Sequence, residues 1–462
     1  MTEHSRSQNP LWQKTYAVCF AILIASLPLS YQPLIHLGAA NGANYDLSLI
    51  YIAMGLLVAV ALPSIWQDRR RLLSKKYNLF ILLFFIWNVI SIVWSANTLR
   101  GTLTSSLIGL GTLLFFSVQT YSATLVRYRH LLLNTLKIVT VVLGLFCLYQ
   151  LFGDAAGLSV RYTLLPIEYT SHVFGFARVT GFSAEPEFLG SLLLLPLGIF
   201  AYLAITKKRM SDILLVGLGA LLITLTLSRG AFIGAVVVIG ITLAFYCRRS
   251  NLRQVGLLLA SGFLGVILGI GLFSLAAGLN TRDDISAHQA FSKAVSQVSL
   301  GTINPTQTPP TTVKSIRKIE SQPSSGYVAS STTSRLQMSN EALGLLIEHP
   351  SRFLYGVGVG GFGVSLHQKS PNFSKASIVN NQYIEILTEL GIVGLVLFGG
   401  FFYTFFRQLI REKYYIFISI IVGTLIQWLF FSGYPNILHI WPILGAAIIF
   451  APKAIHRERS SL

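Results

Sequence analysis

A series of apolar segments, most of them about 17 to 25 residues long, constrains this chain more than any other feature of its sequence. An α-helix of that length spans the hydrocarbon core of a bilayer and satisfies its own backbone hydrogen bonds there. Only 11% of the 462 residues are charged, against about 25% in a soluble domain. We therefore predict an all-α fold, a polytopic transmembrane helical bundle.

We predict twelve spans, most of them joined by short loops. Their ranges are 15–34, 45–65, 78–95, 102–121, 132–152, 187–205, 212–228, 230–247, 255–279, 385–406, 415–432 and 438–451. Two connecting segments are long, namely 153–186 and 280–384. Because long loops in compact proteins often carry function, these two segments are the candidate functional surfaces.

The basic residues predict an orientation in the membrane. With the N-terminus in the cytoplasm, the short basic loops and both tails face the cytoplasm, and they hold 21 of the 35 lysines and arginines. We therefore predict cytoplasmic termini and an extracytoplasmic loop at 280–384. The first apolar run has no small-residue cleavage site, which predicts a retained helix. The net charge of +18 would indicate a nucleic-acid partner in a soluble protein, but membrane topology accounts for it here.

The chain divides into four predicted parts. They are the first five spans with the first outer loop (1–174), spans six to nine (175–279), the extracytoplasmic loop (280–384), and the last three spans with the tail (385–462). Within the loop, 297–334 is rich in Ser, Thr and Pro, which predicts a mobile linker, and 335–384 is expected to be structured. Ser334 and Gln337 form a capping-box pattern, so we expect a helix to begin there and to end near His349.

Neither a metal nor a nucleotide site is indicated. The cysteines all fall in apolar runs, the histidines are scattered without metal-ligand spacing, and we expect no metal and no cofactor. The segment Gly358–Gly363 fits the string G-x-G-x-x-G, but it lacks the preceding strand and following helix of a dinucleotide fold. A tight turn is the expected structure there.

Arg229 is the most informative ionisable residue within the predicted spans. It lies in the run ITLTLSRGAFIGAVVVIG, at a predicted hairpin on the outer membrane face. An arginine there either extends its side chain to the interface or binds an anion. We favour an anion site, because outer basic residues are disfavoured by topology and Gly230 permits close approach.

Two more arginines are candidates for the same role. Arg335 would begin the capped helix, where the helix dipole attracts an anion such as phosphate; the alternative is an exposed loop arginine. Arg178 precedes span six in FARVTGFSAEPEFLG and is a candidate phosphate or sugar contact. Glu185 and Glu187 flank Pro186 in that segment, and they serve either as ordinary helix-start residues or, for Glu185, as a base.

Polar residues before span ten are candidates for binding sugar hydroxyls. They are Asn380, Asn381 and Tyr383, whose alternative role is to cap the helix that follows. Glu389 lies one turn after Glu385 on the same helix face and is a candidate base or orienting group. His367, near the end of the loop, is a further candidate, with a plain surface residue as the alternative.

Three features together resemble one known family. They are SRGAFIG at the span hairpin, the Arg335 helix followed by HPSRFLYGVGVGGFG, and NNQYIEILTELGIVGL entering span ten. Over residues 175–400 the chain resembles the O-antigen ligase and O-antigen polymerase superfamily of bacterial envelope glycosyltransferases. The resemblance implies a GT-C-like, polytopic protein of the bacterial inner membrane, with its long loop in the periplasm.

The resemblance also implies a reaction and partners. Such proteins transfer an undecaprenyl-diphosphate-linked glycan, with inversion and without a nucleotide sugar, to a hydroxyl of a glycan, of lipid A-core or of a protein. A regulator of chain length is a further expected partner, besides membrane lipids. Arginines matching Arg229 and Arg335 are thought to hold the diphosphate, and we expect Arg178 to help them.

Two details favour a polymerase over a ligase. Lipopolysaccharide ligases usually carry His-Asn where this chain has Asn380–Asn381, and an amide takes no proton at neutral pH. The EPEFLG segment looks more like polymerases of repeat units. We expect the acceptor to be positioned by Asn380, Asn381 and Tyr383, and the base to be Glu185, Glu389 or His367, in that order. A transporter of lipid-linked sugars and a membrane scaffold stay open as alternatives.

Overall fold

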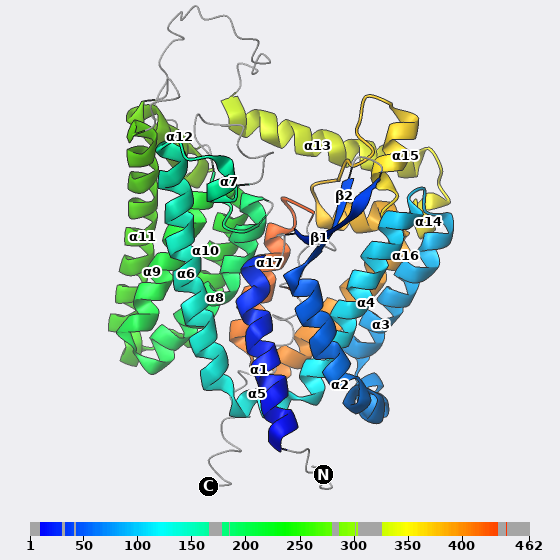
Figure 1. Cartoon of the computed structure of the whole chain (residues 1–462), viewed down its shortest axis with the longest axis horizontal. Coiled ribbons are helices and arrows are strands. Elements are labelled where there is room, and N and C mark those ends of the chain that lie inside the picture. The colour runs from blue at the N-terminus through cyan, green and yellow to red at the C-terminus, as the bar shows by residue number, and fades with distance from the viewer. Residues whose placement is uncertain are drawn as a thin grey trace, which may run out of the picture. The chain divides into compact units, whose positions relative to one another are not determined.

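The computed structural model describes residues 10–29, 33–40, 43–165, 178–183, 185–279, 286–300, 302–303, 326–432 and 440. These residues are predominantly helical (Figure 1). Among them, nine helices are long and apolar enough to cross a bilayer. The chain is therefore a multi-pass membrane protein, as the apolar runs predict.

The long apolar helices begin and end close to the predicted spans. They are α1 (Pro10–Ser26, extended to Leu29), α2 (Leu49–Leu73), α3 (Lys76–Ser91, extended to Trp94), α4 (Thr98–Thr120), α6 (Arg129–Ala155), α8 (Pro186–Lys207), α10 (Arg229–Tyr246), α11 (Leu252–Leu279) and α16 (Gln382–Arg411). Two shorter apolar helices, α9 (Met210–Thr226) and α17 (Tyr415–Gln427), occupy two further predicted ranges. The twelfth predicted span, 438–451, lies outside the described residues except for Ile440.

Two strands between α1 and α2 depart from the all-α prediction. Strand β1 (Pro33–Ala40) pairs antiparallel with β2 (Ala43–Ser48), so that Pro33 lies opposite Ser48 and Ala40 opposite Ala43. Pro33 and Gly38 both disfavour a helix through this segment, which explains why the helical spans stop short of it.

In the described part of the loop predicted at 280–384, four helices precede α16, namely α12 (Ala287–Val298), α13 (Gly326–Ile347), α14 (Arg352–Tyr355) and α15 (Phe362–Lys369). The prediction that a helix begins at Ser334 is wrong, because α13 begins eight residues earlier, at Gly326. The intervening stretch contains no proline, and a capping-box pattern does not end a helix that already runs through it. Residues 326–334 are thus helical rather than part of a linker.

The chain forms two compact units, and α6 and α13 each pass from one to the other. Unit 1 comprises Met1–Thr140 and Glu341–Leu462, and unit 2 comprises Val141–Asn340. In unit 1, α3 packs on α16 and α2 packs on α4. Aromatic rings fill the core between α3, α4 and α16, with Phe115 in edge contact with both Phe401 and Phe405.

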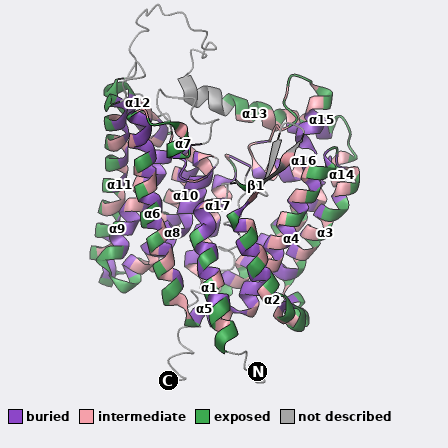
Figure 2. Ribbon diagram, in the orientation of Figure 1, coloured by how far each residue is buried: buried purple, intermediate pink, exposed green. Residues whose placement is uncertain are grey.

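In unit 2, α8 is the central helix. The apolar segment of α8 is 89% buried, whereas those of α10 and α11 are only 28% and 22% buried (Figure 2). Helix α8 packs on α9 and α10, and α9 packs closely on α11. The α9–α11 contact depends on small residues, since a Cβ added to Gly265 would overlap the backbone of Gly217. Helices α10 and α11 therefore present most of their apolar surface outward.

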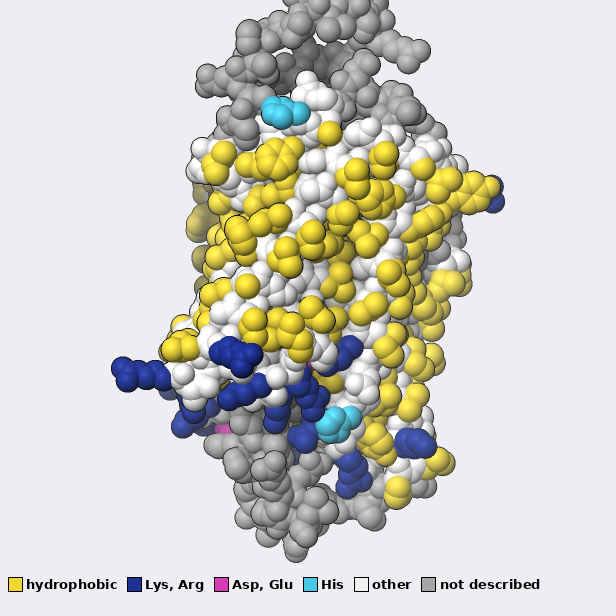
Figure 3. Space-filling view, turned by 90° about the vertical axis from the view of Figure 1, so that its left-hand side faces the viewer, with side chains coloured by type: hydrophobic (Ala, Val, Ile, Leu, Met, Phe, Trp, Pro, Cys, Tyr) yellow, Lys and Arg dark blue, Asp and Glu magenta, His cyan; other side chains and the backbone are white. Residues whose placement is uncertain are grey.

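One end of unit 2 is strongly basic. Exposed lysines and arginines follow α8 and α10, at Lys207–Arg209 and Arg248–Arg253. The two loops meet, because Lys208 Nζ donates to the carbonyl oxygen of Ser250 at 3.4 Å. Figure 3 shows the face that includes α11, with hydrophobic side chains over its middle and dark blue basic side chains gathered below. This charge pattern supports the predicted topology, in which both loops lie on one side of the membrane.

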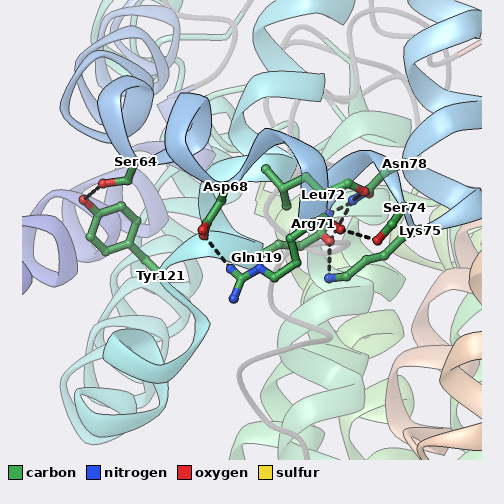
Figure 4. A network of polar contacts seen from close by, with 9 residues as sticks. All are labelled: Ser64, Asp68, Arg71, Leu72, Ser74, Lys75, Asn78, Gln119 and Tyr121. Atoms are coloured by element: carbon green, nitrogen blue, oxygen red, sulfur yellow. Dashed lines mark hydrogen bonds and ion pairs between the residues drawn. The ribbon is translucent and has the colours of Figure 1, made fainter. Parts of the chain in front are cut away.

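In unit 1, a polar network closes the end of the helices where α2, α3 and α4 meet (Figure 4). Gln119, at the end of α4, accepts from Lys75 Nζ at 2.8 Å and exchanges hydrogen bonds with the Asn78 side chain at 2.8 and 3.0 Å. Asn78 Nδ2 also donates to the carbonyl oxygen of Leu72, at the end of α2. The network holds the turn between α2 and α3 against α4.

Candidate active site

The hairpin between α9 and α10 places Arg229. Leu227 adopts a left-handed conformation (φ 49°) that reverses the chain after α9. Ser228 is the N-cap of α10, and its Oγ accepts from Ala231 N at 3.3 Å, while Thr226 Oγ1 accepts from Ser228 N at 3.1 Å. Arg229 thus lies at the predicted hairpin, and it is the first residue of α10, at a helix N-terminus where the dipole attracts anions.

Arg178 binds the same hairpin. Its Nε donates to the carbonyl oxygen of Thr226 at 3.1 Å. The segment after Arg178 is fixed by Gln150 in α6, whose amide exchanges hydrogen bonds of 2.6 and 2.8 Å with the backbone of Gly181. The structure therefore places Arg178 at the turn that precedes Arg229.

The start of α8 supplies two carboxylates and receives Arg335. Pro186 occupies the first turn of α8, and Glu185 is the N-cap residue without making a side-chain capping bond. Glu187, in the first turn, pairs through Oε1 with Nη2 of Arg335. Both side chains are partly buried, at 13% and 27% exposure. Arg335 lies inside α13 rather than at its start, so its position comes from this ion pair and not from a helix dipole.

The N-termini of α8 and α10 touch each other. A Cβ added to Gly190 would overlap the Cβ of Ala231, which is two residues after Arg229. The three arginines therefore gather at one end of unit 2, at the starts of two helices and opposite the basic loops. We call this group (Arg178, Glu185, Glu187, Arg229 and Arg335) the arginine end.

The arginine end suits an oxyanion ligand. Three guanidinium groups outnumber the two carboxylates, and two helix N-termini add partial positive charge. Guanidinium binds phosphate oxygens through two parallel hydrogen bonds, which favours a phosphate or diphosphate over a spherical anion.

The candidate sugar-binding residues lie in unit 1, where they stabilise the start of α16. Asn381 Oδ1 caps α16 by accepting from the backbone N–H groups of Tyr383 and Ile384, both at 3.1 Å. The hydroxyl of Tyr383 donates to the carbonyl oxygen of Leu425 at 2.6 Å. Asn380 is the residue before the cap and has a positive φ of 60°. In the structure, Asn381 therefore has the alternative role given above, that of a helix cap.

His367 is similarly engaged, since its Nδ1 lies 2.8 Å from the carbonyl oxygen of Phe373. This contact holds the segment after α15 against that helix. Nothing in it points to a ligand, and it fits the alternative of a surface histidine with a local structural role.

Glu389 anchors the glycine-rich turn, which is the tight turn predicted at Gly358–Gly363. Its buried carboxylate accepts from Gly360 N at 2.8 Å and from Phe362 N at 3.3 Å. Gly358 and Gly360 have positive φ values of 88° and 71°, which side chains disfavour. Through these contacts Glu389 orients the turn, and its expected role as a base stays a prediction.

Helix α16 is broken beside this turn. Gly391 has φ 67° and ψ −171° inside the helix. The carbonyl oxygens released there accept from other segments: that of Leu390 from Trp87 Nε1, and those of Thr388 and Glu389 from Val357 N and Gly358 N, all at 2.9 Å. Broken helices at membrane depth need such partners, because lipid offers none.

Sequence reasoning did not identify two charged residues that interact with candidate site residues. Glu187 was interpreted only as a helix-start residue, because its pairing with Arg335, 148 residues later, is a tertiary contact that local patterns do not encode. Arg100, in the first turn of α4, interacts electrostatically with both Glu385 and Glu389. It is a basic residue on the predicted outer side, which is the same signal that singled out Arg229.

Metal ligands do not gather in the part of the chain that the structure describes. No group of three or more histidine, cysteine, aspartate or glutamate side chains is placed there to hold an ion.

Comparison with known proteins adds the family. No curated protein matches the chain. The family model of the O-antigen ligases matches residues 214–399, from the start of α9 to the middle of α16. The match includes Arg229, Arg335, the glycine-rich turn and Glu389, and it confirms the resemblance drawn from SRGAFIG and the later segments. The matched segment supports placing the chain with the O-antigen ligase and polymerase superfamily, a group of glycosyl-transferring membrane proteins.

Proposed function

We propose that the protein polymerises undecaprenyl-diphosphate-linked oligosaccharide repeat units, of an O-antigen or exopolysaccharide, on the periplasmic face of the inner membrane. The observation that carries the proposal is the convergence of Arg178, Arg229 and Arg335 at one end of unit 2. A diphosphate is the leaving group of this reaction, and guanidinium groups are suited to hold it. The choice of a polymerase over a ligase rests on the sequence pattern, and so does the assignment of the site to the periplasmic side of the membrane.

In the proposed reaction, a hydroxyl oxygen of the acceptor sugar attacks the anomeric carbon of the donor glycan. The new glycosidic bond forms as the bond to the diphosphate oxygen breaks, so the anomeric configuration inverts. The arginines stabilise the negative charge that develops on the leaving diphosphate, a type of stabilisation that is often the largest contribution to catalysis. In this proposal, the positive charge of the arginines takes the place of a divalent metal ion.

The hydroxyl proton needs an acceptor, and Glu185 is the residue that we propose. It lies in the arginine end, at the N-terminus of α8 and two residues before Glu187, which pairs with Arg335. Glu389 is less suited, because its carboxylate binds the backbone of the glycine-rich turn. His367 is engaged with Phe373 and ranks below both.

Ligation to lipid A-core or to a protein acceptor is the second candidate function, and the family match favours it equally. The feature that separates the two is the pair Asn380–Asn381, in which Asn381 caps α16 and neither residue carries a titratable imidazole. A transporter of lipid-linked sugars is a third candidate; it would place ionisable groups along the middle of several spans.

The test uses the purified full chain in liposomes with a lipid-linked repeat unit. Growth of a glycan ladder on the lipid supports the polymerase, and transfer that occurs only when lipid A-core is added supports the ligase. The variants Arg229→Ala, Arg335→Ala and Arg178→Ala are each expected to slow transfer by about 10²–10³-fold. Arg248→Ala, at the basic-loop end of unit 2, is the matched control. Normal ladders with all three variants would overturn the mechanism.

A further inference from the structure

The two basic loops of unit 2 form one cationic surface. Lys208 joins them through its bond to the carbonyl oxygen of Ser250. We call the exposed lysines and arginines of these loops the basic surface. They are Lys207, Lys208 and Arg209 between α8 and α9, and Arg248, Arg249 and Arg253 between the end of α10 and the start of α11.

The positive charges of the basic surface are not neutralised by nearby carboxylates. Within the described part of the chain, none of the six residues forms an ion pair. The one acidic residue within four sequence positions of either loop is Asp212, whose side chain is fully buried. The bond from Lys208 goes to a neutral carbonyl oxygen and leaves its charge in place. The basic surface therefore offers its full charge to an anion.

The basic turn between α2 and α3 in unit 1 differs, because its arginines have partners within the turn. Arg71 Nη2 pairs with Asp68 Oδ2 at 2.5 Å. The guanidinium of Arg69 lies over the ring of Trp66, at 4.6 Å from its centroid, and donates to the Trp66 carbonyl oxygen at 2.8 Å. Membrane topology favours basic residues in both places, but it does not require that they lack anionic partners. The unpaired charge of unit 2 thus points to a ligand.

The loop after α10 is held in a fixed shape by Asn251, which is buried. Its Oδ1 accepts from Arg248 N at 2.7 Å, and its Nδ2 donates to the carbonyl oxygen of Tyr246 at 2.9 Å. The Lys208–Ser250 bond then fixes this loop against the loop after α8. A binding surface that is already ordered loses less conformational entropy when a ligand binds.

Exposed apolar side chains begin directly beside both loops. Met210 and Leu214 lie one turn apart on α9 and are 56% and 60% exposed, and Leu252, the first residue of α11, is 56% exposed. Figure 3 shows hydrophobic side chains above the gathered basic side chains. A cationic surface bordered by an apolar one matches a phospholipid, with its phosphate at the cations and its acyl chains along the helices. A soluble anion would use only the charged half.

We propose that the basic surface binds the headgroup of a phospholipid that carries two phosphodiesters, diphosphatidylglycerol. Each loop supplies three cations, so that one phosphate of the lipid lies against each loop. Because the two phosphates belong to one molecule, the second contact forms at a high effective concentration. A phospholipid with one phosphate engages one loop only and binds more weakly. This site lies at the opposite end of unit 2 from the arginine end, and it does not depend on the transfer reaction.

Three triple variants of the full chain test the site. One replaces Lys207, Lys208 and Arg209 by glutamine, and a second replaces Arg248, Arg249 and Arg253 by glutamine. The matched control replaces Arg69, Arg70 and Arg71 by glutamine, which removes the same charge from unit 1. All are first checked for monodisperse elution in detergent. Binding of diphosphatidylglycerol, phosphatidylglycerol and phosphatidylcholine is then measured by native mass spectrometry.

Either variant of the basic surface is expected to raise the Kd of diphosphatidylglycerol about 10²-fold, since each cation beside an anionic lipid contributes about fivefold in affinity. The control variant should bind like the wild type, and phosphatidylglycerol should bind the wild type at least about tenfold more weakly. An equal loss in the control variant would mean that overall charge alone attracts the lipid, and it would overturn the proposal. Equal affinity for phosphatidylglycerol would overturn it too, because one phosphate would then suffice.

A second readout needs no change to the basic surface. Cys247 is exposed and precedes Arg248, whereas Cys147 is buried, so a fluorophore can be attached at Cys247 in a Cys19→Ala background. In phosphatidylcholine nanodiscs, spin-labelled diphosphatidylglycerol is expected to quench this fluorophore. Unlabelled diphosphatidylglycerol should reverse the quenching at a concentration at least about tenfold lower than phosphatidylglycerol. Absence of quenching, or equal displacement by both lipids, would reject the site.

Discussion

The guanidinium of Arg335 is paired with the carboxylate of Glu187, although 148 residues separate them in the sequence. The pair joins the middle of α13 to the first turn of α8, whose Gly190 packs on Ala231 of α10. It therefore connects a helix of the long loop with the turn that carries Arg229. An anionic ligand at the arginine end would share Arg335 with Glu187 or take its place, so the pair both positions the arginine and competes for it.

Exchanging the two charges separates these roles. Arg335→Glu alone and Glu187→Arg alone place like charges together and are expected to lower the melting temperature in detergent. The double variant restores an ion pair and should recover most of the loss, but its transfer rate should stay about 10²–10³-fold below wild type, because the cation has moved to α8. Recovery of transfer along with stability would show that the pair is only structural.

Much of this architecture follows from local patterns. The apolar runs predict the long helices, since spanning a bilayer leaves few alternatives, and Arg229 stands out because it interrupts such a run at a hairpin. The start of α13 is different: nothing in the sequence before Ser334 forbids or requires a helix, so the capping pattern misplaced it. Its partner Glu187 depends on tertiary contacts, which local patterns do not encode.

The break in α16 illustrates the same limit. Gly391, Gly394 and Gly399 look alike in the sequence, yet only Gly391 has a positive φ. The reason is the segment before the glycine-rich turn, because a Cβ at Gly391 would overlap the backbone of Leu354 and Tyr355. The conformation of Gly391 thus depends on a segment about forty residues earlier in the chain. The hydrophobic periodicity of the sequence does not show that this segment packs against α16.

Alanine at Gly391 should therefore destabilise the protein strongly. The substitution forces a side chain into a left-handed conformation, which costs on the order of 1–3 kcal/mol, and adds the overlap with Leu354. Gly399→Ala is the matched control, because its Cβ would meet nothing within 4 Å in the same helix. Thermal unfolding in detergent measures both. Equal melting temperatures for the two variants would contradict the broken helix.

Substitution of Glu389 distinguishes a structural role in the glycine-rich turn from the role of a general base in the reaction. Glu389→Gln keeps the size of the side chain but leaves one carbonyl oxygen for two backbone donors, Gly360 N and Phe362 N. The expected loss is about 1–3 kcal/mol in unfolding free energy, with the transfer rate per folded molecule within a few-fold of wild type. A variant of normal stability that has lost transfer would instead identify Glu389 as part of the reaction.

Lys75 makes the stability of unit 1 depend on pH. Burial lowers the pKa of Lys75 from 10.5 to about 8, and the nearby positive charge of Arg71 acts in the same direction. Below pH 8 the lysine is protonated in both the folded and unfolded states, so its contribution to stability is constant. Between pH 8 and 10.5 the unfolded state binds more protons than the folded state, and stability therefore rises with pH through this window.

The measurement is the melting temperature in detergent from pH 7 to 10, as the difference between the wild type and Lys75→Met. The difference is expected to shift in favour of the wild type as the pH rises above 8, because methionine does not titrate. Lys76→Met removes an adjacent but exposed lysine and should leave the pH dependence of the wild type intact. A flat difference for Lys75→Met would mean that the ammonium group, bound to Gln119 Oε1 at 2.8 Å, titrates alike in the folded and unfolded states.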